Sequence, residues 1–372
     1  MNLKRIQIRN FRNHNQTNLT FAVGINALLG NNSEGKTSIL EAISYLGLTK
    51  SFFGASDVTV LQIGKEFFEI EGTILADGGV ENTVQVTYEK SSGEKIVSVN
   101  QTRSDKLTSF IGKFPVVILS PESNGITSGP PAERRKFMDL ILSQVSTAYF
   151  VDLQEYRGVL RQRNKILLDA RSLGRLEPKV IEPWDISLAR YGSRITHRRR
   201  LFAMEFQAFM RNSYRELVPS SEEPQIEYNG IPGSSIDEIA ASMTSEICKH
   251  RSEEVRRGMT LVGPHRDELQ MSISGMSVQK YASQGQHKSL LVALKIAEFF
   301  YVKEHKNEIP MFLLDDVFSE LDELRSQHVL DLIGSIGQTI ITTTGESVFH
   351  DTVSWNGQNR KFYVEKGTCS AR

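Results

Sequence analysis

ALLGNNSEGKTSIL, residues 27–40, decides the fold class of this chain. The apolar residues before Gly30 predict a short buried strand, and the residues from Lys36 onward predict a helix. Gly30, four further residues and then Gly35, Lys36 and Thr37 match the P-loop pattern, in which backbone N–H groups hold phosphates at a helix N-terminus. A glycine-rich turn without a ligand is the alternative, but the complete Gly-Lys-Thr ending after a strand disfavours it. Because this pattern alone indicates either an NTPase or a kinase, other stretches are needed to decide between them.

Length and composition limit the remaining possibilities. At 372 residues, we expect two domains, each able to bury its own core. Lys and Arg together number 44, as do Asp and Glu, so a nucleic-acid surface would need local charge segregation. Cys248 and Cys369 lie far apart in the sequence, which fits a reducing cytoplasm. MNLKRIQIRNF has no apolar signal segment, and no apolar run approaches about 18 residues, so we expect a cytoplasmic protein without membrane contact.

The pattern of apolar and polar residues changes twice along the chain. Up to residue 118, period-2 alternation predicts antiparallel strands, interrupted only by the helix after the P-loop. These stretches are RIQIRNF, TNLTFAVG, EFFEIEGTILA, VENTVQVTYE and KIVSVN, and FPVVILSPE predicts a further buried strand. After the turn SNGITSGPPAE, helical periodicity dominates to about Gly258, which indicates a helical insertion of about 140 residues. From residue 260 an α/β texture returns.

A second informative stretch is PMFLLDDVFSELD, residues 310–322. Four apolar residues from Met311 predict a strand that ends in Asp315 and Asp316. In P-loop ATPases the first carboxylate at this place holds the Mg²⁺ shell, and the second can polarise the attacking water. Adjacent aspartates at a strand end are common by chance, but their position downstream of a P-loop indicates a Walker B motif.

Between these motifs, KYASQGQHKSLLVALKIAEFF places Ser283 and Gly285 before a strongly helical run. By themselves these residues predict only a turn and a helix N-cap. In ABC-type ATPases, however, a serine hydroxyl and a glycine N–H at a helix N-terminus bind the γ-phosphate of a nucleotide held by a second subunit. The order P-loop, helical insertion, signature, Walker B and a D-loop-like SELD (319–322) favours an SMC-like ABC ATPase head.

Several blocks together resemble the RecF family of bacterial recombination mediators, over essentially the whole chain. The blocks are RIQIRNFRNH, GNNSEGKTSILEAISYL, SPESNGITSGPPAERRKFMD, LVGPHRDEL, YASQGQHKSLLVALKIAE and LLDDVFSELD. The resemblance implies an α/β fold, namely an ABC-type (SMC-like) P-loop ATPase head of two lobes with a short helical arm domain. It places the head at residues 1–118 and 260–372 and the arm at residues 119–259.

The resemblance also implies a functional cycle. ATP and Mg²⁺ would join two heads into a homodimer in which each signature serine faces the other subunit's P-loop. The dimer would clamp single-stranded, gapped or junction duplex DNA and act with RecO and RecR to help load RecA, in DNA repair, replication restart and SOS induction. Weak, DNA-stimulated ATP hydrolysis would then reset the clamp. Periodicity and spacing say nothing about these DNA preferences or partners.

The site roles implied by the resemblance fall on the three motifs and on one further arginine. The catalytic residues would be Lys36, Ser283 and Asp316, and the Mg²⁺ ligands would be Thr37 and Asp315. The nucleotide would contact Gly30, Asn31, Asn32, Ser33, Glu34, Gly35, Lys36, Thr37, Ser38, Ser283 and Gly285, with Arg12 as a further candidate. Arg12 follows the first expected strand, and a phosphate contact and a surface charge are both open for it.

Some features depart from related ATPases or have no assigned role. Many relatives carry glycine where this P-loop has Ser33 or Glu34, so we expect a slightly stiffer loop. TIITTT, residues 339–344, offers threonines and no switch histidine, which together with the Asp-Asp ending favours a slow switch ATPase. The Q-loop glutamine is not identified, and LSPESN (119–124) is where we would look for it. GPHRDEL (263–269) could contact nucleotide or DNA, but we favour a hydrogen-bonded bracket between arm and head.

Charge segregation in the arm predicts where DNA binds. Residues 157–200 hold twelve Lys/Arg against four Asp/Glu, whereas residues 201–260 hold six against ten. Two sets of cations recur at i, i+4 and i+8, which places each set on one helix face. Solvated surface charge is the alternative interpretation. We expect contacts with the phosphate backbone from Arg157, Arg161, Lys165, Arg190, Arg194 and Arg198.

Two classes of function remain after this reading. One is a DNA-binding switch ATPase of the RecF kind. The other is an ABC-type motor for a different partner, such as a transporter or another SMC-like repair ATPase. A transporter subunit would be expected to carry the switch histidine and a surface for coupling helices, so DNA-stimulated ATPase activity would separate the two classes.

Overall fold

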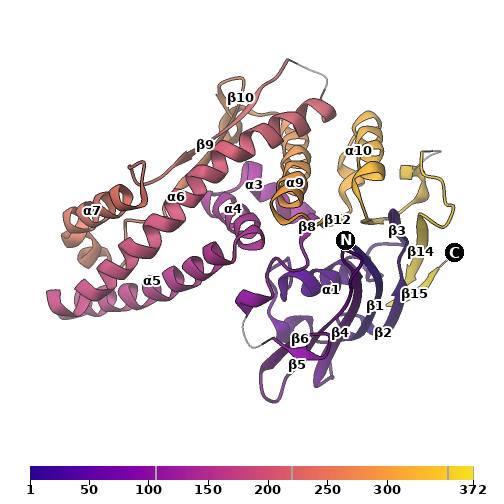
Figure 1. Ribbon diagram of the computed structural model, residues 1–372, viewed down its shortest axis with the longest axis horizontal. Coiled ribbons are helices and arrows are strands. Elements are labelled where there is room, and N and C mark those ends of the chain that lie inside the picture. The colour runs from indigo at the N-terminus through magenta and orange to yellow at the C-terminus, as the bar shows by residue number, and fades with distance from the viewer. Residues whose placement is uncertain (105–106, 219–220, 350–351, 372) are drawn as a thin grey trace. The chain divides into compact units, whose positions relative to one another are not determined.

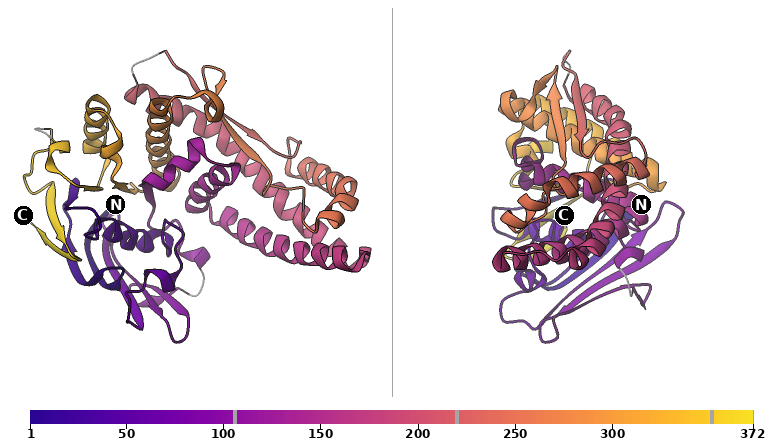
Figure 2. Two further views of the ribbon diagram at one scale, coloured as in Figure 1. Left: turned by 180° about the vertical axis from the view of Figure 1, so that it is seen from behind. Right: turned by 90° about the vertical axis from the view of Figure 1, so that its left-hand side faces the viewer.

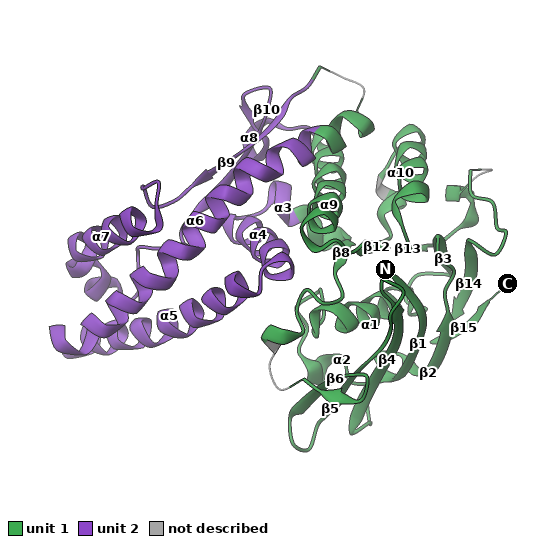
Figure 3. Cartoon of the chain, in the orientation of Figure 1, with its two compact units in different colours: residues 1–124, 212–221, 284–372 green, residues 125–211, 222–283 purple. Residues whose placement is uncertain are grey.

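The computed structural model in Figure 1 describes residues 1–104, 107–218, 221–349 and 352–371. The chain forms two compact units, shown in separate colours in Figure 3. The P-loop unit comprises residues 1–124, 212–221 and 284–372, and the helical unit comprises residues 125–211 and 222–283. These limits differ from the expected 119–259 arm, because residues 260–283 pack with the helical unit and residues 212–221 with the P-loop unit.

The N-terminal strands form an antiparallel sheet in the order β2-β1-β4-β5-β6-β7. Their bounds are β1 (Asn2–Phe11), β2 (His14–Thr20), β4 (Phe67–Leu75), β5 (Glu81–Glu89), β6 (Glu94–Val99) and β7 (Thr102–Arg103). Buried and more exposed residues alternate strictly along the middle of β5, as expected for a strand with one face on the core. The antiparallel strands predicted from period-2 alternation are therefore confirmed.

A second sheet in the P-loop unit has the order β15-β14-β3-β13-β12-β8. Its strands are β3 (Ile25–Leu29), β8 (Val116–Leu119), β12 (Met311–Asp315), β13 (Thr339–Thr343), β14 (Arg360–Glu365) and β15 (Thr368–Ala371). Only β15 pairs antiparallel. Every residue of β3, β8, β12 and β13 is buried, which explains why these strands read as continuous apolar runs. The carboxyl ends of β3 and β12 carry the P-loop and the Walker B pair.

Helix α1 (Lys36–Leu48) lies between the two sheets and contacts strands of both. It is buried on nearly all sides, and most of its side chains after the first turn are apolar. The other helical segments of this unit are α2 (Asp57–Val60), η1 (Leu107–Ser109), η2 (Pro121–Asn124), α9 (Gln284–Lys306), η3 (Val317–Glu320), α10 (Glu323–Ile336) and η4 (Glu346–Phe349). The short α2 corrects the expectation that only one helix interrupts the N-terminal strands.

The helical unit combines helices with a three-stranded antiparallel sheet. The helices are α3 (Gly125–Ser128), α4 (Pro131–Val145), α5 (Thr147–Leu173), α6 (Pro178–Leu217), α7 (Ile236–Arg257) and α8 (Val278–Tyr281), and α6 continues into the P-loop unit. The strands, ordered β11-β10-β9, are β9 (Pro224–Asn229), β10 (Glu268–Ile273) and β11 (Met276–Ser277). The sequence analysis missed β9, because a six-residue strand gains most of its stability from its partner β10, which lies far along the chain.

The long helices α5 and α6, magenta to pink in Figure 2, run antiparallel and are linked by ion pairs. Arg163 of α5 is fully buried and bonds Asp185 of α6 at 2.8 Å and Glu254 of α7 at 2.5 Å. Removing one partner of a buried ion pair typically costs about 3–5 kcal/mol, so this cluster fixes how the three helices pack. In the ranges that the structure describes, no helix has the length and apolar character needed to cross a membrane.

Candidate nucleotide site

The P-loop occupies the turn between β3 and α1, where two glycines have backbone angles that other residues rarely adopt. Gly30 has φ 156° and Gly35 has φ 110°. A side chain at Gly30 would collide with the Val364 carbonyl oxygen, and one at Gly35 would lie 2.7 Å from both Asn13 and the His14 ring. Both glycines are therefore required by the local geometry, and the loop forms the cradle that the sequence pattern predicts.

Lys36, the first residue of α1, points back over the loop. Its Nζ donates to the carbonyl oxygens of Gly30 at 2.6 Å and Asn31 at 2.7 Å. Burial lowers the pKa of Lys36, while the nearby carboxylates of Asp316 and Asp315 oppose that shift. A phosphate could replace the two neutral carbonyls with charged acceptors, which form the stronger hydrogen bonds.

Thr37 and the Walker B strand meet directly. The Thr37 hydroxyl donates to Asp315 Oδ1 at 2.7 Å, and Thr342 of β13 donates to the same oxygen at 2.7 Å. Burial raises the pKa of Asp315, although both hydroxyl hydrogen bonds favour its ionised form. A threonine hydroxyl next to a carboxylate is the oxygen donor set that Mg²⁺ takes in P-loop ATPases, so these residues fit the ion.

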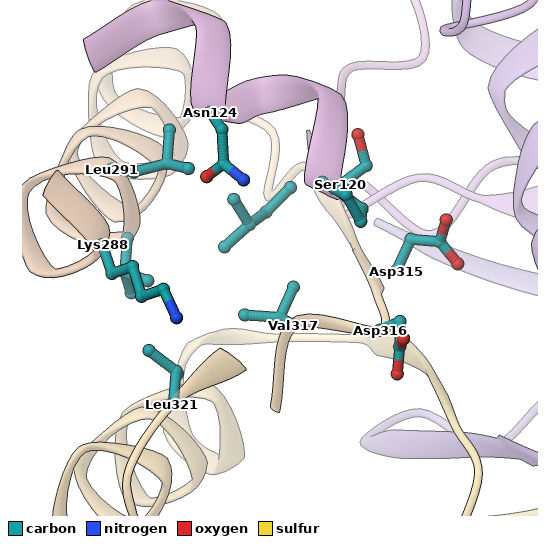
Figure 4. Close-up of a pocket in the computed structure, with 11 residues that line it drawn as sticks. Ser120, Asn124, Lys288, Leu291, Asp315, Asp316, Val317 and Leu321 are labelled. Carbon is teal, nitrogen blue, oxygen red and sulfur yellow. The ribbon is translucent and has the colours of Figure 1, made fainter. Parts of the chain in front are cut away.

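Asp316 follows β12 in a left-handed backbone conformation, with φ 49°. Its backbone N–H donates to Thr342 Oγ1 at 2.9 Å. Asp316 lines both the P-loop hollow and a small cavity of about 20 Å³, drawn in Figure 4. That cavity has room for about one water, and the Lys288 side chain points into it. Ser120 and Asn124, from the LSPESN segment in which a Q-loop residue would be sought, line the same cavity.

An open hollow of about 460 Å³ lies against the P-loop, within the range of roughly 300–1,000 Å³ typical of small-molecule sites. It is lined by Arg12, Asn13, Asn32, Ser33, Gly35, Lys36, Thr37, Ser38, Thr59, Leu61, Ile63, Asp316 and Thr342. Ile63 is almost fully exposed in it. The hollow thus joins the predicted phosphate loop and Walker B end to a partly apolar wall.

Arg12 lies at this hollow, but its guanidinium is already engaged. Nε and Nη2 donate to the two carboxylate oxygens of the buried Glu41, at 2.7 and 2.8 Å. The hydrogen bonds to Glu41 raise the pKa of Arg12. Ser51 donates to the same carboxylate. Arg12 is therefore a fixed cation on the wall of the hollow, placed where it could also meet a bound anion.

The turn between β14 and β15 is hydrogen-bonded to the P-loop through Glu34. The Glu34 carboxylate accepts from the Lys366 backbone N–H, and the Glu34 carbonyl accepts from Gly367 N–H at 3.0 Å and from the Asn13 amide at 3.0 Å. His14, fully buried, donates from Nε2 to the Gly35 carbonyl at 3.0 Å. Glu34 thus secures the loop to the hairpin.

The signature residues occupy the start of α9. Ser283 directly precedes the helix, and Gly285 lies in its first turn, where an added side chain would touch the Arg325 guanidinium at 3.4 Å. Neither of them is among the described residues that line the P-loop hollow. This placement is compatible with a signature motif that serves a second subunit.

The arm cations lie on the expected helices but differ in their surroundings. On α5, Arg161 and Lys165 are exposed, and Arg157 pairs with Asp139 at 3.3 Å. The α6 residues are more engaged: Arg194 pairs with Asp152 at 3.2 Å, Arg198 lies 3.8 Å from Glu205, and Arg190 packs over the Tyr191 ring. The α5 set is therefore the more available for phosphates.

The GPHRDEL block lies entirely in the helical unit. His265 donates from Nε2 to the Thr260 carbonyl at 3.2 Å and accepts at Nδ1 from the Tyr156 hydroxyl at 2.6 Å. Asp267 accepts from Tyr228 and, at 3.2 Å, from Thr196. The block ties α5, α6, β9 and the segment after α7 to one another. In this block and in the rest of the described ranges, no cluster of three or more His, Cys, Asp or Glu could hold a metal ion.

Sequence reasoning missed four contributors to the site: His14, Glu41, Thr342 and the β14–β15 hairpin. Glu41 and His14 lie beside recognised motifs, but a glutamate in a helix and a histidine in a strand carry no signal of their own. Thr342 could have been found, since TIITTT was already identified as the neighbouring strand. Only the pairing of β12 with β13 shows which of its threonines faces Asp315.

The two sheets around α1, the P-loop and the Walker B end define the class of SMC-like P-loop ATPase heads. The sequence profile of the "RecF/RecN/SMC N terminal domain" family matches residues 2–368. The "DNA replication and repair protein RecF" of Chloroherpeton thalassium is 39% identical over 356 residues, covering 94% of this chain and 96% of its own. This chain belongs to the RecF family.

Solved structures agree with this membership. The "recombination mediator protein RecF-ATPrS in RecFOR pathway" superposes with a TM-score of 0.92 at 30% identity, covering 100% of this chain and 98% of that one. The corresponding "RecF-ATP" structure gives 0.91 at 30% identity, covering 100% and 97%. The expected ABC-type (SMC-like) head fold is thereby confirmed.

Proposed function

We propose that this chain is an ATP-dependent recombination mediator that binds DNA and uses slow ATP hydrolysis as a switch. The observation that carries the proposal is the contact of Thr37 with Asp315, which joins the P-loop to the Walker B strand at 2.7 Å. The RecF relatives named above support it, since they are described as recombination mediators and as ATP complexes.

In the proposed site each residue has a separate task. The loop from Gly30 to Ser38, which includes Lys36, binds the phosphates. The fixed cation Arg12 adds positive charge at the wall of the P-loop hollow. Thr37 and Asp315 would hold Mg²⁺, which neutralises phosphate charge when bound. Asp316 orients the attacking water and accepts its proton. With only an aspartate in this role and no switch histidine, we expect slow turnover.

The remaining roles in the proposal require a second copy and DNA. Ser283 and Gly285 would contact the γ-phosphate held by the partner's P-loop, so that ATP creates a homodimer. The arm cations Arg157, Arg161, Lys165, Arg190, Arg194 and Arg198 would contact the backbone of gapped or junction DNA. RecO and RecR would be the protein partners, and RecA would be loaded indirectly.

Measuring the mass of the protein in solution tests the assembly step. We expect a dimer with ATP and a monomer with ADP or without nucleotide, each measured with and without a gapped duplex. Ser283→Arg should bind ATP and remain monomeric, whereas the matched control Ser91→Arg, at an exposed residue of the β5–β6 turn, should dimerise. An unchanged monomer with ATP in the wild type would contradict the proposal.

An ABC-type motor for a partner other than DNA is the second candidate. The measurement that separates the two is ATP hydrolysis with and without gapped DNA. We expect stimulation by DNA that disappears in Lys36→Ala. Hydrolysis that DNA leaves unchanged would favour the motor for another partner.

A further inference from the structure

The helical unit contains a second hollow, which shares no lining residue with the P-loop site. It measures about 280 Å³ and lies among α4, α5, α6 and the segment at residues 264–265. Four cationic side chains line it, from Arg135, Lys136, Arg157 and Arg199, against the single carboxylate of Asp139. We call this hollow the arginine pocket; its lining carries a net of three positive charges.

The lining carboxylate of the arginine pocket accepts hydrogen bonds at both of its oxygens. Asp139 Oδ1 accepts from the Tyr149 hydroxyl at 2.5 Å and from Arg199 at 2.7 Å, and its Oδ2 accepts from Arg157 at 3.3 Å. Arg199 is itself buried and also donates to the Pro264 carbonyl at 2.7 Å. Asp139 is therefore shared between the buried Arg199 and Arg157, and the lining keeps an excess of positive charge.

Arg135 interacts electrostatically with the nearby carboxylates of Glu268, Asp267 and Asp139 but is not directly paired with any of them. It is half-buried, and among the described residues its one hydrogen bond goes to the neutral Asp267 carbonyl, at 2.8 Å. Across the described ranges, no carboxylate forms a salt bridge with it. A guanidinium has five N–H donors, so most of this group's hydrogen-bonding capacity is available to a ligand. Burial and, to a lesser degree, the charge of Arg199 lower the pKa of Arg135, while the carboxylates of Glu268, Asp267 and Asp139 oppose that shift.

The uncharged side chains that line the pocket are hydrogen-bonded within the protein or apolar. The ring nitrogens of His265 are used by Thr260 and Tyr156. Ala132, Leu153, Leu160 and Ile195 complete the wall. An apolar wall strengthens electrostatic attraction, because less water screens the charges.

We propose that the arginine pocket binds a phosphate group of a DNA backbone. Arg135 is the principal ligand, and Lys136 and Arg157 contribute at the rim, where their side chains are 66% and 53% exposed. Arg157 also begins the exposed α5 row with Arg161 and Lys165, so a strand on that row reaches the pocket. That the phosphate belongs to DNA rests on the proposed function. That the pocket binds a phosphate group rests on the lining residues alone.

The test measures binding of a fluorescently labelled gapped duplex at several salt concentrations. Arg135→Ala should weaken binding roughly ten- to hundredfold, as expected for the loss of charged hydrogen bonds, and reduce the slope of log K against log salt by about 0.9. Arg135→Lys should recover part of the affinity. The control Arg256→Ala removes one exposed charge of the same unit outside the pocket and should change little. ATP binding and thermal unfolding monitor the fold of each variant.

A second arm separates this inference from the proposed function. Inorganic phosphate is titrated calorimetrically into the wild type and into Arg135→Ala without DNA. Binding that Arg135→Ala abolishes supports the pocket even if the wild type binds no DNA, in which case only the DNA source is withdrawn. Wild-type affinity and salt slope for DNA in Arg135→Ala, or no effect of the substitution on phosphate binding, would overturn the inference.

Discussion

The P-loop hollow and the arginine pocket both present cations to a ligand but differ in how that charge is balanced. At the P-loop, Asp315, Asp316 and Glu34 act on Lys36, and Glu41 engages Arg12. In the arginine pocket, Asp139 is the one carboxylate among the lining residues against four cations, and Glu268 and Asp267 act on Arg135 from nearby. The first site therefore suits an anion that brings its own divalent cation, whereas the second suits an anion without one. Similar side chains thus serve different ligands because of their carboxylate neighbours.

The largest expected effect is on chemistry at the P-loop site. Asp316→Asn should bind ATP and dimerise normally but hydrolyse ATP about 10²- to 10⁴-fold more slowly, because the base is lost while the shape of the site is kept. Phosphate release in single-turnover experiments measures this. Glu122→Gln, which replaces an exposed carboxylate near Asp315, is the matched control. Normal hydrolysis in Asp316→Asn would assign the base elsewhere.

Lys36→Ala should weaken ATP binding roughly a hundredfold, since it removes the charged contacts to the phosphates. Titration with a fluorescent ATP analogue measures the dissociation constant. Lys4→Ala, at an exposed lysine paired with Glu81, should bind like the wild type. Phosphate binding at the arginine pocket should be the same in all three proteins. If Lys36→Ala kept wild-type affinity for ATP, the loop assignment would be wrong.

The positive charge around the arginine pocket should make the free energy of unfolding depend on pH in the acid range. Burial, together with the charges of Arg266, Arg135 and Arg163, lowers the pKa of His265 to about 4 from an ordinary value near 6.5. The unfolded chain binds this proton more readily than the folded one. The free energy of unfolding is therefore highest above about pH 6.5 and falls by about 3 kcal/mol as the pH decreases toward 4. Urea unfolding of the wild type and His265→Gln across this window measures it. An equal pH slope in both proteins would contradict the assignment.

Removing divalent cations should separate the two sites. With EDTA, affinity for ATP should fall about tenfold or more, because the carboxylates at the P-loop then face the phosphates without a metal between them. Inorganic phosphate should bind the arginine pocket equally well with and without EDTA. Calorimetry on the same preparation measures both. Loss of both activities on chelation would remove the distinction drawn between the sites.

The smallest expected effect distinguishes the two rows of arm cations. Replacing Arg161 and Lys165 of α5 by alanine should lower the salt slope of DNA binding by about 0.7–0.9 per residue. Replacing Arg194 and Arg198 of α6 should lower it less, because their ion pairs with Asp152 and Glu205 already occupy them. Equal changes would show that these surface pairs open readily on DNA.

Much of the fold was predictable where the signal lies within one segment. Alternation in β4 and β5 and the apolar run of β12 identified these strands, and helical periodicity before Gly258 identified the stretch that contains α4, α5 and α7. Prediction failed at β9, which depends on β10, and at the unit boundary, where α6 continues from one unit into the other. In both places the deciding contacts come from residues far away in the chain.

The sequence by itself determined the phosphate loop and the Walker B carboxylates, because a P-loop is built from consecutive residues whose glycines and helix start are local. The tertiary structure alone decided that Thr342 faces Asp315, that Glu41 holds Arg12, and that the C-terminal hairpin secures Glu34. It alone also assembled the arginine pocket from three helices and a loop. Charge balance depends on which side chains meet in space, and that is fixed by packing between distant segments.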